Sequence, residues 1–421
     1  MAPMIIKYRE FLQRLTPVVL TQTAGLTCGV VGVKVASRYV PPDVLGDYGI
    51  FMSFTTLGMW VVHAGLIKYV GRHWAATESK PALLRQMVQL WFDKLPWIVL
   101  GSIGAALSIG QLTGNPTWGL FPSLLIITGV LSLVAMGQTA LQVNREHWTD
   151  FGVSATGSVT RTFLPLTLFL VIGGAAGLYA GLTFHILIGL GMVAWVMRRH
   201  WRAPRNRELS SPQVKEIYTG PYFTFLAMAA WILTGVNRWV IAGFFGDIEA
   251  GYFTLASNIA LIVPTFAGTV FTQMFQPGFY ALGDDDQPMN RNRLSRRVDL
   301  VAAGFFAVSL TGVLALHTIM PWLIGPLVHV NYSTALQWIV PVGFFGIAII
   351  TGQYFHSMLM AARKERACAP VDLTATTLLI LGSVFAAMVG QTTFMQWLMI
   401  TPLIPWLVTR PLARHFYFKR V

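Results

Sequence analysis

The sequence predicts an all-α integral membrane protein in which twelve transmembrane helices form two pseudo-symmetric six-helix bundles. Three observations support this fold class. The 421-residue chain is 54% hydrophobic and only 11% charged, whereas soluble domains are about 25% charged. Apolar runs long enough to span a bilayer recur along the chain, and such spans are helical because lipid offers no partner to unpaired backbone groups. A sequence repeat divides the chain near its middle.

The repeat consists of residues 34–53, KVASRYVPPDVLGDYGIFMS, and residues 238–257, RWVIAGFFGDIEAGYFTLAS. The two segments align without a gap at an offset of 204 residues (238 − 34), which is close to half of the chain. This pattern indicates a duplication, in which both halves share one design. In transporters built from repeated halves the working site usually lies where the repeats meet, so we expect the functional residues there.

The apolar runs predict twelve spans joined by loops that alternate in charge. We expect the spans at residues 12–39, 48–71, 87–111, 118–141, 151–172, 175–197, 216–243, 250–276, 298–323, 333–361, 368–389 and 393–410. Loops rich in Lys and Arg alternate with loops that contain neither, and the positive-inside rule then places both termini in the cytoplasm. The expected organisation is an N-terminal six-helix bundle at 1–197, a polar cytoplasmic linker at 198–215 and a C-terminal six-helix bundle at 216–421.

The stretch GDDDQPMNRNRLSRR, residues 283–297, follows the eighth span. A run of acidic residues is followed there by a run of arginines. We interpret the stretch as a solvated cytoplasmic loop, with anchoring to anionic lipid as the alternative.

Composition and motifs exclude several functions. The net charge of +13 reflects the basic loops of a membrane protein and does not predict nucleic-acid binding. The chain contains no P-loop, no His-Glu-x-x-His and no Gly-x-Ser-x-Gly motif, so we expect neither an enzyme nor a cofactor. Cys28 and Cys368 show no metal or disulfide pattern and are expected to be small packing residues.

Cations within the spans are the candidate substrate-binding residues, because a charge in the bilayer costs about 2.5–3.5 kcal/mol on the insertion scale. Arg161 lies about ten residues, or ~15 Å, from either end of the fifth span. Lys34 and Arg38 are four residues apart and share one face of the first span. Arg238 occupies the place of Lys34 in the second repeat, and Asn237 beside it could add a hydrogen bond. The alternatives are snorkelling for Lys34 and Arg38, and a structural ion pair or a hydrogen-bonded packing role for Arg161.

The acidic residues lie in loops or near span ends, and none is expected at mid-membrane. Interior cations without such acids favour an anionic substrate, since Arg matches phosphate and carboxylate oxygens. His185, near the middle of the sixth span, is a candidate carrier of a coupling proton, with a hydrogen-bonded packing histidine as the alternative. Asp43 and Asp247 lie in matching outer turns and are candidate gate residues, with turn capping as the alternative.

Several stretches resemble a known family. They are YVPPDVLGDYGIFMSF, HAGLIKYVGRHWA and, in the second half, NRWVIAGFFGDIEAGYFTLASNIALI. They are similar to Wzx-type polysaccharide flippases of the multidrug/oligosaccharidyl-lipid/polysaccharide (MOP) exporter superfamily, and the resemblance covers nearly the whole chain. It implies a V-shaped pair of six-helix bundles like that of the multidrug and toxic compound exporters (MATE) of the same superfamily.

The resemblance also implies a substrate and a place in the cell. Such proteins move an undecaprenyl-diphosphate-linked oligosaccharide across the bacterial cytoplasmic (inner) membrane, in a pathway that includes polysaccharide polymerase machinery. The resemblance leaves open whether the repeat unit belongs to O-antigen, capsule or exopolysaccharide, and which ion is coupled.

Two other functions are weighed against this one. A MATE-like multidrug/cation antiporter would share the fold, but such exporters commonly carry buried carboxylates, which the spans here lack at mid-membrane. A membrane polymerase or ligase usually carries a large outer loop with basic groups, and every predicted outer loop here is short and free of Lys and Arg.

Overall fold

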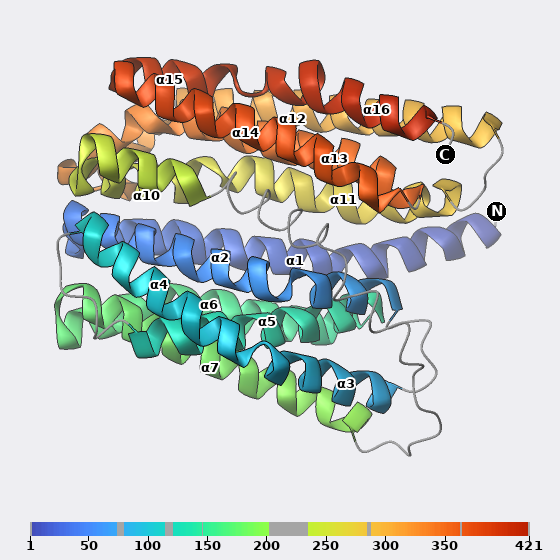
Figure 1. The fold of residues 1–421 in the computed structure, drawn as a ribbon, viewed down its shortest axis with the longest axis horizontal. Coiled ribbons are helices and arrows are strands. Elements are labelled where there is room, and N and C mark those ends of the chain that lie inside the picture. The colour runs from blue at the N-terminus through green and yellow to red at the C-terminus, as the bar shows by residue number, and fades with distance from the viewer. Residues whose placement is uncertain are drawn as a thin grey trace. The chain divides into compact units, whose positions relative to one another are not determined.

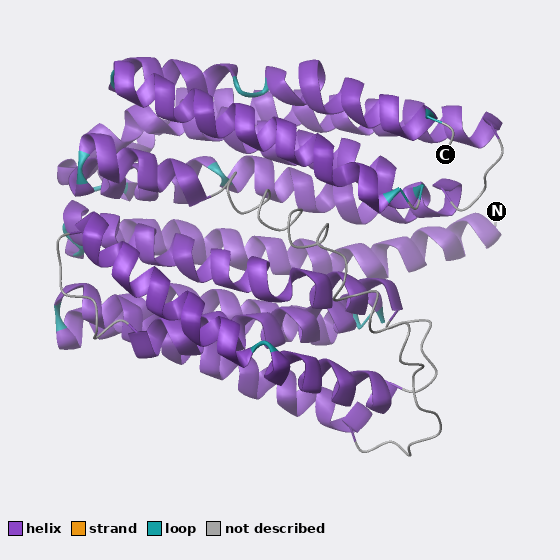
Figure 2. Cartoon of the chain, in the orientation of Figure 1, coloured by secondary structure: helices purple, strands orange, loops and turns teal. Residues whose placement is uncertain are grey.

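The computed structural model describes residues 2–73, 80–113, 121–144, 146–201, 235–283, 288–362 and 364–419. These residues form helices joined by short turns, with no strand among them (Figure 1, Figure 2). Seven of the described helices are long and apolar enough to cross a membrane, or up to nine if each of two bent helix pairs counts as one span. The predicted all-α, multi-pass architecture is confirmed. Most of the predicted seventh span, 216–243, and of the predicted linker, 198–215, lies outside the described residues.

The chain folds as two compact units. Unit 1 comprises Met1–Ala36 and Phe54–Thr224, and unit 2 comprises Ser37–Ser53 and Phe225–Val421. Residues 37–53 belong to the first copy of the sequence repeat, yet they pack with the helices that follow the second copy.

Unit 1 is built from the first seven helices. They are α1 (Ala2–Tyr39) as far as residue 36, α2 (Pro42–His73) from residue 54, α3 (Lys80–Asp93), α4 (Leu95–Thr113), α5 (Phe121–Val143), α6 (His147–Ile172) and α7 (Gly174–Trp201). The predicted third span is divided at Lys94 into α3 and α4, whose axes differ by 47°. Pro96 follows this break, and its missing N–H suits the first turn of a new helix.

Helices α6 and α7 form a closely packed hairpin, seen as the two neighbouring green helices in Figure 1. Gly173 and Gly174 connect them with positive φ angles of 82° and 58°, a conformation that a residue with a Cβ adopts only at a cost. A Cβ at Gly181 of α7 would collide with the backbone of Pro165 in α6. Glycine at these positions therefore permits both the tight turn and the close approach.

Unit 2 contains the remaining elements. They are the helical residues 235–245, α10 (Asp247–Ala260), α11 (Ile262–Gly283), α12 (Pro288–Leu327), the 3₁₀-helix η2 (Val330–Trp338), α13 (Ile339–Ala361), α14 (Glu365–Val389), α15 (Gln391–Ile400), the π-helix η3 (Pro405–Thr409) and α16 (Arg410–Phe418). The first turns of α2 join this unit as well.

The core of unit 2 is organised around Trp338, which is fully buried. Its ring packs edge-on against Phe253 and Phe394, with centroid distances of 5.5 and 6.1 Å. The indole Nε1 donates a hydrogen bond of 3.2 Å to Glu249, which also accepts one of 3.0 Å from Gln391. A buried indole needs such a partner, and the shared carboxylate links α10, η2 and α15.

Hydrogen bonds explain why the turn between α1 and α2 packs with unit 2. The Tyr332 hydroxyl donates to the carbonyl oxygen of Val40 at 2.9 Å. The His329 backbone N–H donates to Ser37 Oγ at 3.2 Å. Both donors lie at η2, so this 3₁₀-helix holds a turn from which it is separated by 292 residues in the sequence.

The prediction of a loop at 283–297 is wrong for its second part. Helix α12 begins at Pro288 and continues without a break into the predicted ninth span. Proline is favoured in the first turn of a helix, and arginine is a good helix former. The arginines of this segment therefore lie on a helical extension of the span, whereas residues 284–287 lie outside the described residues.

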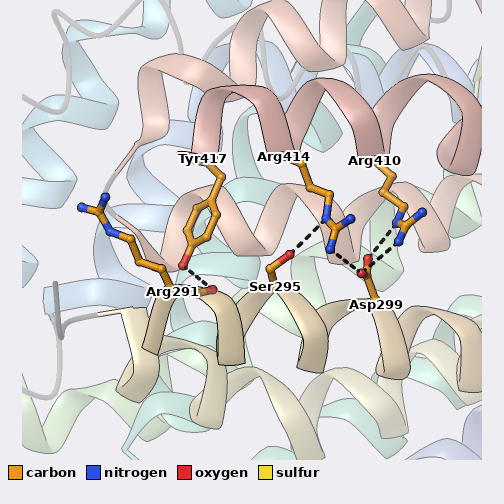
Figure 3. A network of polar contacts seen from close by, with 6 residues as sticks. All are labelled: Arg291, Ser295, Asp299, Arg410, Arg414 and Tyr417. Atoms are coloured by element: carbon orange, nitrogen blue, oxygen red, sulfur yellow. Dashed lines mark hydrogen bonds and ion pairs between the residues drawn. The ribbon is translucent and has the colours of Figure 1, made fainter. Parts of the chain in front are cut away.

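Helix α16 is held against this extension by a polar network centred on Asp299 (Figure 3). The Asp299 carboxylate accepts hydrogen bonds from Arg410 Nε at 2.9 Å and Nη2 at 3.0 Å. It also forms an ion pair of 3.0 Å with Arg414, whose Nε donates to Ser295 at 3.1 Å. The fork of a guanidinium on a carboxylate gives directional as well as electrostatic stabilisation.

We expect Asp299→Ala to lower the free energy of unfolding by about 1–2 kcal/mol, because it removes these hydrogen bonds and leaves two arginines side by side. Thermal unfolding of the purified protein in detergent measures the change. Asp93→Ala is the matched control, since Asp93 is an exposed carboxylate at the end of α3. Equal melting temperatures for the two variants would contradict a stabilising role for Asp299.

Candidate functional site

In unit 1, α1 and α6 approach each other closely beside two of the predicted binding residues. A Cβ at Gly32 of α1 would lie only 2.6 Å from Cγ2 of Thr162 in α6. Small residues allow such an approach of helices in membranes. Lys34 lies two residues after Gly32, and Arg161 directly precedes Thr162. The contact therefore brings the backbone segments that carry Lys34 and Arg161 to the same level of unit 1.

Arg161 lies far from both ends of α6. The helix begins at His147 and ends at Ile172, so Arg161 is ~21 Å along the helix from one end and ~17 Å from the other. Its side chain is exposed, and no hydrogen bond or ion pair joins it to another described residue. The alternative of a structural ion pair therefore finds no partner among the described residues.

Lys34 and Arg38 both have exposed side chains on the last turns of α1. Arg38 lies over the ring of its neighbour Tyr39, 5.8 Å from the centroid, which is within cation–π range. Because α1 ends at Tyr39, Arg38 is in a position from which it can reach the membrane surface. The division into units separates the two residues, since Lys34 belongs to unit 1 and Arg38 to unit 2.

Asn237 and Arg238 lie in the helical residues 235–245 of unit 2. Asn237 is only 3% exposed, and its Nδ2 has no hydrogen-bond partner among the described residues. Arg238 is half-buried. The next residue, Trp239, donates from its indole to Ser53 Oγ at 2.6 Å. The segment that carries Arg238 is thus attached to α2 within unit 2.

His185 of α7 contacts α6 next to Arg161. Its Nδ1 lies 2.8 Å from Thr160 Oγ1, and Thr160 also donates to the carbonyl oxygen of Thr156 at 2.8 Å. The Thr160 hydroxyl uses its one proton for this carbonyl, so toward the imidazole its oxygen can only accept. The hydrogen bond between the two side chains therefore requires the His185 tautomer in which Nδ1 carries the proton. His185 of α7 thus contacts the residue that precedes Arg161 in α6, and the two side chains are close enough for their charges to interact.

Asp43 and Asp247 lie in the first turns of α2 and α10, both within unit 2. Asp43 is exposed and Asp247 is half-buried. A third carboxylate, Asp47, lies close enough to both for the three charges to interact. The repeat aligns Asp47 with Gly251, so sequence matching missed it, although its spacing of four from Asp43 puts both on one helix face. Negative charges in first turns are favoured by the helix dipole.

The first turns of α2 and α10 are in close contact through glycines. A Cβ at Gly46 would collide with the backbone carbonyl of Asp247, and a Cβ at Gly251 with that of Pro42. The contact lies beside the three aspartates. No side chain fits between the two helix backbones here, at the turns where the gate is predicted.

The sequence analysis also missed a histidine–carboxylate pair in unit 2. His356 Nδ1 of α13 lies 2.9 Å from Asp372 Oδ2 of α14, and both side chains are mostly buried, with 17% and 20% exposed. The two residues are 16 positions apart and belong to different helices, so no local spacing reveals the pair.

The described part of the chain holds no group of three or more His, Cys, Asp or Glu side chains that could bind a metal ion. Cys28 and Cys368 are free thiols and are buried, in agreement with their predicted packing role.

A family model described as polysaccharide biosynthesis protein matches residues 35–325, which is more than half of the chain. No curated protein matches the chain by sequence. Solved structures match over nearly the full length. An inward-facing multidrug resistance MATE family transporter of the MOP superfamily has a TM-score of 0.62 and 13% identity, with 97% of this chain and 100% of that chain covered.

Two further solved structures have the same fold. A mutant of the Vibrio cholerae MATE transporter VcmN has a TM-score of 0.61 and 13% identity, with 98% of each chain covered. An outward-facing multidrug resistance MATE family transporter of the MOP superfamily has a TM-score of 0.58 and 12% identity, with 96% of this chain and 95% of that chain covered. The chain therefore belongs to the polysaccharide biosynthesis protein family and has the fold of the MATE transporters of the MOP superfamily.

Proposed function

We propose that this protein is a flippase for an undecaprenyl-diphosphate-linked oligosaccharide repeat unit of an O-antigen, capsule or exopolysaccharide. It moves this lipid from the cytoplasmic to the outer leaflet of the bacterial inner membrane by alternating access, with both termini in the cytoplasm. The family match to polysaccharide biosynthesis proteins supports a saccharide substrate, and the MATE fold supports transport.

The position of Arg161 carries the proposal. An exposed guanidinium deep along a membrane-spanning helix, without an acidic partner among the described residues, is available for an anionic ligand. Arg binds phosphate oxygens through two parallel hydrogen bonds, and a low local dielectric strengthens the contact. Lys34, on the helix packed against α6, adds a second positive charge in unit 1. In this proposal both hold the diphosphate.

Five residues of unit 2 complete the proposal. Arg38 and Arg238 bind anionic groups of the substrate, such as phosphate or acidic sugars, and Asn237 contributes its unpaired amide. Asp43 and Asp247 act at the gate formed by the first turns of α2 and α10. When Asp43 and Asp247 are both ionised, the repulsion between their carboxylates favours separation of the first turns of α2 and α10.

The test is flipping of lipid-linked oligosaccharide in proteoliposomes that contain the purified protein. A sugar probe added outside reports the lipid that reaches the outer leaflet. Faster appearance of accessible sugar than in protein-free liposomes supports the flippase. No acceleration with several lipid-linked repeat units, in a sample shown to be folded, combined with raised tolerance of expressing cells to cationic dyes, would support a MATE-like multidrug/cation antiporter instead.

The role of His185 in proton coupling is tested in the same liposomes with and without a pH gradient. If His185 carries the coupling proton, we expect His185→Gln to flip lipid at one rate in both conditions, whereas the wild type responds to the gradient. Glutamine keeps a hydrogen-bond partner for Thr160 but does not titrate. His356→Gln is the comparison, because His356 is a second partly buried histidine whose ring contacts another helix, 2.9 Å from Asp372 of α14. A gradient response lost only in His356→Gln would transfer the role to that pair.

A further inference from the structure

The end of unit 2 formed by α12 and α16 contains a pocket that the proposed function does not use. The pocket has a volume of about 650 Å³ and is lined by Asn292, Arg414, His415, Phe418 and Lys419. Asn292 belongs to the helical extension of α12, and the other four residues belong to α16 or directly follow it.

The walls of this pocket are held in place from both sides. The Tyr417 hydroxyl donates to the carbonyl oxygen of Arg291 at 3.3 Å, and Arg414 is bound to Ser295 and Asp299 (Figure 3). Lys364 Nζ also donates to the carbonyl oxygens of Phe416 and Tyr417 in the last turn of α16, at 3.2 and 2.9 Å, and to that of Lys419 after the helix, at 2.8 Å. These carbonyls have no partner within the helix, so Lys364 caps α16 and fixes its end.

The chemistry of the lining suits an anion attached to an apolar group. Two of the lining residues, Arg414 and Lys419, carry a positive charge, His415 can acquire one, and no lining residue is acidic. Asp299, the carboxylate bound to Arg414, is shared with Arg410. The exposed ring of Phe418 adds an apolar wall. A free inorganic anion gains nothing from contact with an apolar wall, whereas the acyl chain of a phospholipid can pack against it.

The pocket also lies at the right depth for a lipid. The predicted ninth span begins at residue 298, six residues after Asn292, which is ~9 Å along α12. Headgroup layers extend about 5–8 Å beyond each side of the hydrocarbon core. In the structure, the part of α12 that is apolar enough to cross a membrane, Asn290–Trp322, begins beside Asn292. The pocket therefore lies near the end of this span, at the level expected for lipid headgroups. Further exposed arginines, Arg293 and Arg296, lie on the same extension.

We propose that the pocket between α12 and α16 binds the phosphate of an anionic phospholipid headgroup, with Arg414 and Lys419 on the phosphate, Asn292 as a hydrogen-bond donor and Phe418 against the glycerol and upper acyl chain. This assignment does not depend on the identity of the transported substrate. The proposal also gives a specific partner, an anionic phospholipid, to the basic segment after the eighth predicted span. This segment is the start of α12 and forms one wall of the pocket through Asn292.

The test is native mass spectrometry of the full-length protein in detergent, titrated with phosphatidylglycerol or with phosphatidylcholine. We expect the wild type to bind one phosphatidylglycerol several-fold more tightly than phosphatidylcholine. Lys419→Glu should weaken phosphatidylglycerol binding by about fivefold or more, since each basic residue near the lipid contributes on this scale. Lys419 is exposed at the end of the helix, so the variant should fold, and Asn292→Asp provides a second test from the other wall.

Arg293→Glu is the matched control, because it makes the same charge change on the α12 extension at an exposed residue that does not line the pocket. Tight binding in Arg293→Glu and weak binding in Lys419→Glu supports the proposal. Equal weakening in both would show diffuse attraction and overturn it. Equal affinity for the two lipids would overturn it as well. If inorganic phosphate bound as tightly as phosphatidylglycerol, the ligand of the pocket would be a soluble anion, and the assignment to a lipid would be overturned.

Discussion

Replacing Arg161 with alanine is expected to reduce the rate of lipid-linked oligosaccharide flipping by about tenfold to a hundredfold. The reduction follows from losing a charge-assisted contact with the diphosphate, which is worth about 1.5–3 kcal/mol. Binding of the lipid-linked substrate to the purified variant should weaken by a similar factor. The side chain is exposed and has no partner among the described residues, so the fold should tolerate its removal.

Two variants separate the binding role of Arg161 from other causes. Arg161→Lys keeps the charge but loses the planar fork, so we expect intermediate activity. Arg85→Ala removes an exposed arginine of α3 and should leave flipping unchanged. If Arg161→Ala flips lipid at the wild-type rate while remaining folded, Arg161 does not bind the substrate, and the observation that carries the proposed function is lost.

Replacing Gly251 with valine is expected to separate the first turns of α2 and α10. A Cβ at this position would overlap the carbonyl group of Pro42, and a backbone atom cannot rotate away as a side chain can. Overpacking of this kind costs about 1–3 kcal/mol. Thermal unfolding should therefore shift to a lower temperature. Flipping should also fall if the gate must close in each cycle, which the proteoliposome assay measures.

Gly243→Val is the control for the contact at Gly251. Gly243 lies in the helical residues 235–245 of the same unit, and a Cβ there would meet no atom within 4 Å. The two variants make the same chemical change and carry the same loss of helix propensity. Similar melting temperatures and similar flipping rates for both would show that the close contact of α2 with α10 has no role in stability or gating.

Much of the fold follows from local patterns in the sequence. Hydropathy and the charge of loops predict helical spans because lipid imposes the same requirement on every segment that crosses it. The break at Lys94 was not predicted, although Pro96 is a local signal that could have indicated it. The second part of the loop predicted at 283–297 is wrong. A basic segment without apolar periodicity is typical of a solvated loop, but from Pro288 onward it is a helix against which α16 packs.

In the candidate site too, local sequence patterns indicate some residues, whereas others are revealed only by tertiary contacts. Spacing alone placed Arg161 deep in a span and put Lys34 and Arg238 at matching positions of the repeat. It could not reveal Asp47, which the repeat pairs with a glycine, or the pair of His356 with Asp372, which lie on different helices. Spacing also does not reveal two side-chain hydrogen bonds between helices. They join His185 to Thr160, 25 residues apart, and Trp239 to Ser53, 186 residues apart.

The sequence by itself determined the membrane class and the helical fold, because burial in lipid and helix periodicity act on consecutive residues. It also contains the internal repeat and the cations on which the proposed function rests. Only the tertiary structure decided that residues 37–53 pack with unit 2, that Asp299 binds Arg410 and Arg414, and that a shallow basic pocket lies between α12 and α16. Those features depend on which helix faces meet, and that choice is made by packing between distant segments.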